Sequence, residues 1–126
     1  MVDLLFAERV RSHLVEMVPF VEKKMFGGIG FLVEGKMAVG VSSKGGLIVR
    51  VEHEETLILI QEENVGPMTS SGRISRGWVI VDQAAFFNDA ILLDWIERGV
   101  FFALRSAEEE EQRHTRRKNS QGNDGE

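Results

Sequence analysis

The sequence lacks cysteine and tyrosine, contains only two prolines among 126 residues, and has no long apolar run. Without cysteine there are no disulfides, thiolate nucleophiles or cysteine-ligated zinc sites, and this composition is typical of a reducing compartment. No stretch approaches the roughly 20 apolar residues that cross a bilayer. The opening MVDLLFAERVRSHL also lacks the basic start and long apolar core of a signal peptide. We therefore expect a soluble, cytoplasmic protein without membrane contact.

Basic charge is scarce as well. The formal net charge is −5, and acidic residues outnumber basic ones both in residues 1–107 (14 against 11) and in residues 108–126 (6 against 4). A non-specific nucleic-acid binder draws most of its affinity from neutralised phosphates and presents a basic face. With no tyrosine, the sequence also gives no sign of interleaved aromatic platforms for base stacking. Direct nucleic-acid binding is therefore not expected.

Apolar residues recur with the periods of helices and strands. Asp3 is placed to cap a helix in which Phe6, Val10 and Leu14 share one face, and Pro19 ends that helix. The period then shortens, and the pattern predicts three strands joined by tight turns, at residues 21–33, 37–41 and 47–51. The rest of the pattern predicts a short helix at about 54–63, strands at 68–70 and 78–81, and a final helix at about 88–107.

This order, α-β-β-β-α-β-β-α, predicts an α+β fold with a five-stranded antiparallel sheet and helices in two layers. The predicted domain covers residues 1–107. The remaining sequence, EEEEQRHTRRKNSQGNDGE, contains no apolar residue and predicts a charged, disordered tail over residues 108–126. Its charge blocks leave two alternatives open: ion pairs along a solvated extension of the helix, or contact of the basic half with an acidic partner.

Five glycines interrupt the strand-forming residues of KKMFGGIGFLVEGKMAVG. The glycine spacing before Lys36 matches part of a phosphate-binding loop, but Met37 stands where that loop needs a hydroxyl for Mg²⁺, and a strand follows where a helix is required. We therefore reject a phosphate site. The structural interpretation is that Gly27 and Gly28 bend one long strand, while Gly35 supplies the positive φ of a turn.

Apolar residues of the final helix extend beyond a single face. Ile91, Leu93, Phe101 and Phe102 widen the stripe made by the residues at helical spacing, among them Trp95. Exposed apolar area of this kind marks partner surfaces, so we predict a homodimer or partner contact with Phe101 and Phe102 as the self-association residues. The alternative is a helix buried deeply in the protein's own core.

No residue cluster indicates catalysis, a cofactor or a metal. HEETL begins like a zinc-protease motif, but Leu57 takes the place of the second histidine, so His53 is expected to complement a helix dipole. The best binding candidates are Arg73 and Arg76 in SSGRISRG, because a turn exposes guanidinium groups beside free backbone amides that hold an anion. If the sheet brings their strands together, a basic patch would also include Lys23, Lys24 and Arg50. The alternative is a solvated turn and a charged strand edge.

Several stretches occur together in one order: KKMFGGIGFLVEGKMAVG, EETL, the Gly-Pro-Met triplet, GRISRGWVIV and the apolar final helix. Between about Phe6 and Leu104 the chain thereby resembles the TfoX N-terminal domain family, also called the Sxy family, of competence regulators. The most specific part is the pattern MFGG-x-G-x-x-x-x-G-K. The positions that the resemblance assigns to structure are Met25, Phe26, Gly27, Gly28, Gly30, Gly35, Trp78 and Trp95.

The resemblance implies a two-layer fold similar to secretion chaperones, with no catalytic residues. Full-length family members resemble transcriptional coactivators that act with the cyclic-AMP receptor protein at competence promoters, and they carry a second, C-terminal domain where we expect the charged tail. We therefore predict a non-enzymatic regulatory or adaptor module that acts through protein contacts, with the transcription machinery as partner. The alternative is a small-ligand or anion-binding module that uses the concave sheet face and the turn from Arg73 to Arg76.

Overall fold

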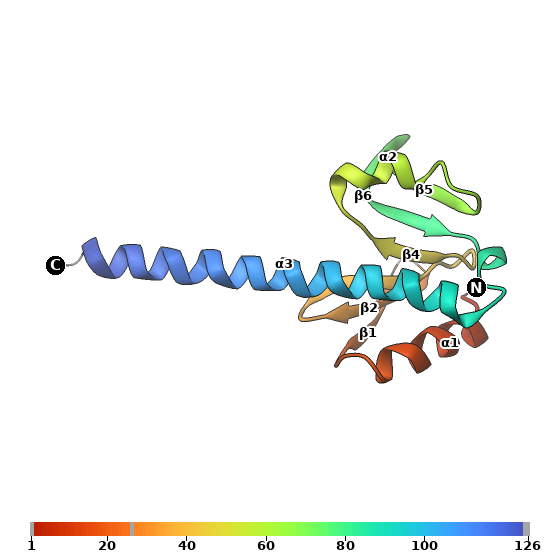
Figure 1. Cartoon of the computed structure of the whole chain (residues 1–126), viewed down its shortest axis with the longest axis horizontal. Coiled ribbons are helices and arrows are strands. Elements are labelled where there is room, and N and C mark those ends of the chain that lie inside the picture. Colours follow the sequence, from red (N-terminus) through yellow and green to blue (C-terminus); the bar gives the residue numbers. More distant parts are fainter. Residues whose placement is uncertain (1, 26, 125–126) are drawn as a thin grey trace.

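The computed structural model describes residues 2–25 and 27–124, and of residues 118–124 it describes the backbone alone. The helices are α1 (Leu4–Val15), α2 (Thr56–Leu59) and α3 (Asp89–Asp124), with short 3-10 turns η1 (His53–Glu55) and η2 (Gln83–Ala85). The strands are β1 (Val21–Met25), β2 (Gly28–Val33), β3 (Lys36–Val41), β4 (Leu47–Arg50), β5 (Val65–Ser70) and β6 (Arg73–Val81) (Figure 1).

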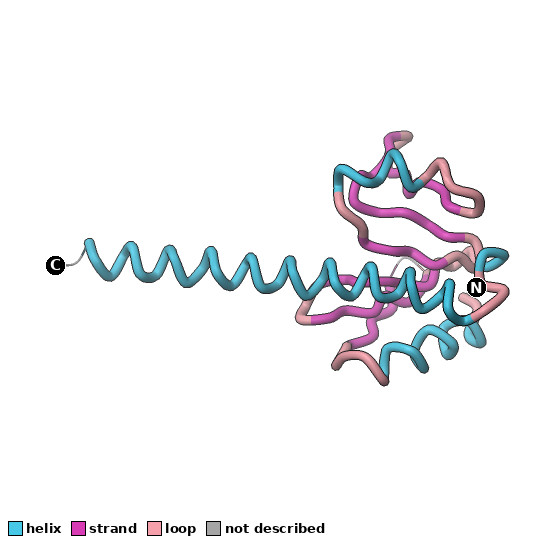
Figure 2. Tube along the Cα trace, viewed as in Figure 1, coloured by secondary structure: helices cyan, strands magenta, loops and turns pink. Residues whose placement is uncertain are grey.

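The strands form one antiparallel sheet in the order β1-β2-β3-β4-β6-β5. Helices α1 and α3 cover one face of it, so the molecule has two layers (Figure 2). The predicted α+β class is confirmed, but the sheet has six strands where five were expected. The additional strand comes from residues 21–33, which were predicted as one strand and form the two strands of a hairpin.

Gly27 lies in a turn and Gly28 begins the next strand, so the two glycines do not bend a single strand. Met25 pairs directly with Gly28 across the hairpin, so the turn consists of two residues. Gly27 has a φ of +78°, a conformation that two-residue hairpins require and that glycine adopts without strain. The interpretation of Gly27 and Gly28 as a bend within one strand was therefore wrong. Phe26, which the family resemblance assigns to structure, lies outside the described residues.

Two further boundaries differ from the prediction. The helix expected at 54–63 is only the turn η1 followed by α2, because the chain reverses at Asn64, whose φ is 67°, to begin β5. Arg73 and Arg76 lie in strand β6, so the expected turn at these arginines was also wrong. Ser71 and Gly72 alone, with φ angles of 52° and 78°, form the two-residue turn, and Ser70 pairs with Arg73 beyond it.

The core lies between the sheet and the helices. Phe31 of β2, Val39 of β3 and alternate residues of β4 and β6 point toward the buried faces of α1 and α3, which contribute residues such as Leu14 and Ile96. The buried strand residues facing the helices on β4 and β6 are Leu47, Val49, Val79 and Val81. In residues 2–25 and 27–124, no helix packs on the opposite face of the sheet.

The start of α1 is fixed by polar contacts. The Asp3 carboxylate accepts a hydrogen bond from the Phe6 amide at 3.0 Å, as predicted for an N-cap. Arg9 on α1 donates to the Asp89 carboxylate at 3.0 Å and to the Phe86 carbonyl at 3.0 Å, which docks α1 against the start of α3. The hydrogen bond from Arg9 lowers the pKa of Asp89, and the Phe6 amide lowers the pKa of Asp3.

Helix α3 runs beyond the sheet as a projecting rod (Figure 1). It continues through Asp124, whereas a disordered tail was predicted from residue 108. Residues 100–121 contain no glycine or proline, and helical neighbours pair their charges, as Arg105 does with Glu109 at 3.8 Å. Lys36 in β3 also forms an ion pair with Glu110. In the part of the chain that the structure describes, no helix has both the length and the apolar character to cross a membrane.

Candidate functional site

The uncovered face of the sheet carries apolar side chains where polar ones are expected. An antiparallel sheet with one exposed face normally alternates apolar and polar residues. Here Leu47 and Val49 point into the core, and yet Ile48 between them and Ile80 directly opposite on β6 are also apolar. The face thus has the composition of a buried surface without a layer to bury it.

These side chains line a groove of about 340 Å³ on the open face. Every strand of the sheet contributes, since Met25 lies on β1 at one edge and Met68 on β5 at the other. Among the residues that the structure describes, none of those lining the groove is charged. The lining residues are Met25, Gly28, Ile29, Met37, Val41, Ser42, Ser43, Ile48, Met68, Ser75, Trp78 and Ile80.

Two glycines make the floor of this face. Gly30 and Gly40 lie directly opposite each other on β2 and β3. The Met25 methyl carbon is 2.9 Å from the position that a Cβ on Gly30 would take, and the Met37 methyl carbon is 2.5 Å from the corresponding position on Gly40. Each methionine therefore lies on bare backbone, and a side chain at either glycine would collide with it. The glycine pattern serves this close packing on the open face.

Trp78 lines one side of the groove, and the guanidinium group of Arg50 packs on its ring. The Arg50 guanidinium carbon is 4.7 Å from the Trp78 ring centroid and also 4.7 Å from that of Phe102 on α3. Arg50 further donates to the Gly77 carbonyl at 2.9 Å. Burial lowers the pKa of Arg50, but guanidinium groups titrate so far above neutral pH that it keeps its charge. Arg50 therefore acts in packing between the sheet and α3.

The neighbouring residue Gly77 forms a local distortion of β6. Its φ is +97°, and its carbonyl accepts a hydrogen bond from the Val51 amide at 2.9 Å. Its own amide donates to the hydroxyl of Thr56 at 2.7 Å. Thr56 is fully buried, and its hydroxyl also donates to the Glu52 carbonyl at 3.2 Å. This contact joins the start of α2 to β6 at the residue before Trp78.

The predicted basic patch is not assembled. Lys23 and Lys24 lie on β1, whereas Arg73 and Arg76 lie on β6, and three strands separate β1 from β6. Lys23 shares the open face, because it lies opposite Gly30, and Lys24 points to the other side. Arg73 also lies on the open face, two residues before the groove residue Ser75. Basic side chains thus occur at opposite ends of the open face.

Helix α3 presents a second, smaller apolar area on the covered side. Phe101 is 65% exposed, and Phe102 is partly buried against Arg50 and Arg105. Trp95 packs against the core, with the Arg98 guanidinium 5.1 Å from its ring centroid. The predicted self-association residues therefore differ in environment, and only Phe101 offers most of its side chain to solvent.

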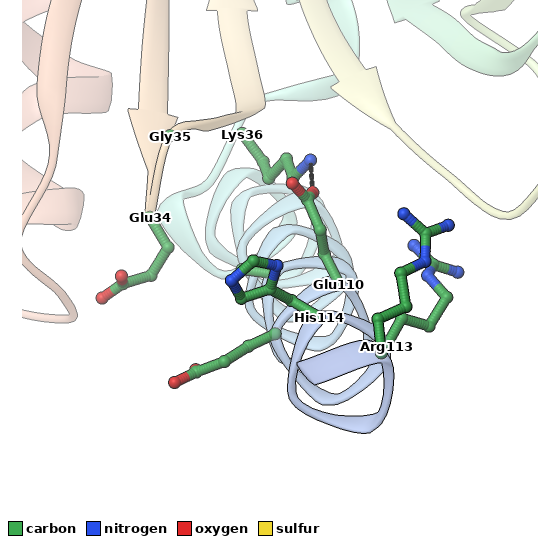
Figure 3. Close-up of a pocket in the computed structure, with 9 residues that line it drawn as sticks. Glu34, Gly35, Lys36, Glu110, Arg113 and His114 are labelled. Carbon is green, nitrogen blue, oxygen red and sulfur yellow. Dashed lines mark hydrogen bonds and ion pairs between the residues drawn. The ribbon is translucent and has the colours of Figure 1, made fainter. Parts of the chain in front are cut away.

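A charged recess lies where the β2–β3 turn meets the projecting part of α3 (Figure 3). Lys36 pairs with Glu110 there, and this hydrogen bond lowers the pKa of Glu110. Arg113 and His114 extend from the next turn of the helix, and Glu34 faces the recess from the hairpin. Its charges are mixed and exposed. Among residues 2–25 and 27–117, whose side chains are described, no group of three histidine, aspartate or glutamate residues is arranged to hold a metal ion.

A sheet with one helix-covered face and an apolar groove on its open face, lined by no charged residue among those described, defines a two-layer α+β domain whose open face is suited to binding. The family model of the TfoX N-terminal domain matches residues 12–103 of the 126-residue chain, so the chain belongs to this family. The resemblance inferred from the glycine motif is thereby confirmed. The comparison with curated proteins found no match, and the comparison with solved structures found none either.

The ligand-binding alternative named the concave sheet face, but the sequence did not identify the groove residues, because they are far apart along the chain. Met37, Ile48, Met68 and Ile80 were read as ordinary strand residues. The available signal was the continuous apolar character of LIV in β4 and WVIV in β6, which is typical of strands buried on both faces. These apolar runs predict that something covers the second face of the sheet, but they do not show where on the face a partner binds.

Proposed function

We propose that this protein is a non-enzymatic regulatory or adaptor module that binds a partner protein through the open face of its sheet. The observation that carries the proposal is the uncovered apolar groove, to which all six strands contribute and which no charged side chain of the described residues lines. A contiguous exposed apolar surface is typical of interaction sites. Methionine is frequent on such surfaces, because its flexible side chain adapts to the shapes of different partners.

The membership in the TfoX N-terminal domain family supports a role in regulation. On this basis we propose the transcription machinery as the source of the partner and the cytoplasm as the location, to which the lack of cysteine also conforms. A second candidate function is binding of a small apolar molecule, because a groove of about 340 Å³ lies within the size range of ligand sites. The Arg73 and Arg76 side chains are candidate contacts for an anionic group in either case.

The test compares a groove variant with a matched surface variant. Ile48→Glu places a charge in the centre of the groove, and Ile58→Glu places the same charge on α2, where Ile58 is 69% exposed. Tagged wild-type and variant proteins are used to recover partners from the native cells, and circular dichroism verifies that both variants fold. We expect a partner that is retained by the wild type and Ile58→Glu and lost by Ile48→Glu. Equal recovery by all three proteins would contradict docking in the groove.

Self-association is proposed through the exposed ring of Phe101. Because Phe101 is 65% exposed beside the ion pairs of η1 and α3, a second copy can cover it without disturbing the core. Sedimentation velocity should show a concentration-dependent dimer for the wild type and a monomer for Phe101→Ser. A wild-type monomer at all concentrations up to about 100 µM, well above a typical micromolar Kd, would contradict this proposal.

A further inference from the structure

We infer that the partner segment on the open face is an amphipathic helix whose apolar stripe is flanked by acidic residues. This inference rests on the proposed function, because it names the partner of the same groove. Three properties of the open face carry it: its extent, the methionines that lie over its two glycines, and the sign of the charges at its ends.

The extent of the groove suits a helix of about four turns. Its lining residues run from Met25 on β1 to Met68 on β5. Six strands spaced by about 4.8 Å span about 24 Å, which equals the length of a helix of about 16 residues. A strand added to an edge would leave the centre, Ile48 and Ile80, uncovered, and Pro67 on the β5 edge removes a backbone donor that such pairing uses. A helix laid on the face buries the centre and both ends together.

The floor of the groove allows close approach. Gly30 and Gly40 present backbone only, and Met25 and Met37 lie over them. Unbranched methionine side chains have three rotatable bonds and change rotamer readily. If the two methionines swing aside, apolar side chains of a partner helix can reach the glycine backbone. Helix-in-groove recognition uses anchors at spacings of three and four residues for this purpose.

The charges around the groove determine the flanks of the partner. The groove lining itself is uncharged in the described residues, whereas Lys23 at the β1 end and Arg73 at the β6 end share its face. Lys44 is exposed in the turn directly after Ser42 and Ser43, which line the groove. Glu34 faces the charged recess beside α3 on the other side of the sheet. Acidic flanks on a partner are therefore attracted at both ends, and basic flanks are repelled.

The experiment uses three designed peptides and methionine methyl groups as reporters. The first peptide, of about 18 residues, carries leucines at helical spacing flanked by glutamates. The second has the same leucines flanked by lysines, and the third has the glutamates with the leucines replaced by serines. Protein labelled with ¹³C at the methionine methyls reports on the groove through Met25, Met37 and Met68, and Met17, which packs against the core, serves as internal control.

We expect the acidic leucine peptide to shift the three groove methyls, and to bind about ten-fold more tightly than the lysine peptide at low salt. The serine peptide should cause no shift. The double variant Lys23→Glu and Arg73→Glu should reverse the preference in favour of the lysine peptide while the Met17 signal stays unchanged. Raising the salt concentration should reduce the preference without abolishing binding.

Two outcomes would overturn the inference. Equal affinity for the acidic and basic peptides, unchanged by the double variant, would contradict the acidic flanks of the partner. The proposed docking function would not be affected by this result. No shift of any groove methyl with peptide at about 1 mM, a concentration that detects even weak binding, would remove the helical partner, and the proposed function would then be decided by the comparison of Ile48→Glu with Ile58→Glu. In that second case, a shift of these methyls by indole would assign the groove to a small apolar ligand.

Discussion

The guanidinium of Arg50 lies over the ring of Trp78, 4.7 Å from its centroid, and so connects the wall of the open groove to the covered side of the sheet. On its other side the same group meets Phe102 of α3 at an equal distance. A cation between two rings gains attraction from both. The position of Trp78 on the open face therefore depends on how α3 is docked.

Replacing Arg50 by methionine keeps an unbranched apolar stem and removes the guanidinium group with its charge and its hydrogen bond to the Gly77 carbonyl. We expect a loss of about 1–3 kcal/mol in the free energy of unfolding, from the lost cation–π contacts and the lost hydrogen bond together; the Gly77 carbonyl keeps its hydrogen bond from the Val51 amide. Urea unfolding followed by tryptophan fluorescence measures it. Arg73→Met, on the exposed part of β6, should stay within about 0.5 kcal/mol of the wild type. Equal effects of the two changes would show that the Arg50 contacts contribute little.

Gly40 and Gly66 offer a matched pair for the role of the glycine floor. A Cβ on Gly40 would approach the Met37 methyl to 2.5 Å and the Ile29 carbonyl to 2.9 Å, whereas a Cβ on Gly66 would meet nothing within 4 Å. Gly40→Ala should destabilise the protein by about 1–3 kcal/mol through overpacking. Gly66→Ala should leave the stability unchanged or raise it by about 0.4–1 kcal/mol. Thermal or urea unfolding of both variants measures the two effects. A Gly40→Ala protein as stable as the wild type would contradict the requirement for glycine at this position.

Thr56 is the buried polar residue on which the distortion of β6 depends. Thr56→Val preserves the shape of the side chain and leaves the Gly77 amide without its acceptor, so we expect a loss of about 1–3 kcal/mol. Thr69 on β5 is exposed, and Thr69→Val should be close to neutral. Denaturant midpoints of the two variants give the comparison. A denaturant midpoint of Thr56→Val equal to that of the wild type would mean that another acceptor replaces the hydroxyl.

The ion pair between Arg9 and Asp89 predicts loss of stability in acid. Because the hydrogen bond from Arg9 lowers the pKa of Asp89 in the folded protein, folding is favoured by the ionised carboxylate. The resulting stabilisation is fully present above the ordinary aspartate pKa of about 3.9 and is lost as the pH falls through the lower, folded value. Asp89→Asn should therefore weaken the dependence of stability on pH below about 4. Urea unfolding between neutral and acidic pH measures this dependence, with Asp94→Asn as the surface control.

Local sequence signals predicted the types and order of the elements well. The capping aspartate of α1, the turn at Glu34 and Gly35, and the apolar period of α3 each reflect interactions between residues close in the chain, and each is confirmed. The hairpin after Met25 was missed, because a glycine pair fits a bend in one strand as well as a two-residue turn between two strands. The pairing of β1 with β2 distinguishes the turn from the bend, and this pairing is visible only in the folded structure.

The candidate site was much less predictable than the fold. Arg73 and Arg76 were selected because charge is visible in a sequence, but proximity to Lys23 depends on strand order, which places three strands between them. The groove depends on pairings such as Gly30 with Gly40 and Ile48 with Ile80, and these arise only when the sheet forms. A surface that depends on which residues of different strands lie side by side cannot be recognised in any short segment of the sequence.

The rod formed by the end of α3 changes how the whole molecule moves in solution. Residues 108–124 add about 26 Å of helix to one side of the domain, at 1.5 Å per residue. Such a body rotates more easily about the rod than end over end, so the nuclear relaxation of each backbone N–H will depend on the angle that its bond makes with α3. Its friction in water will also exceed that of a sphere of 14.2 kDa, and column elution alone will overstate the mass.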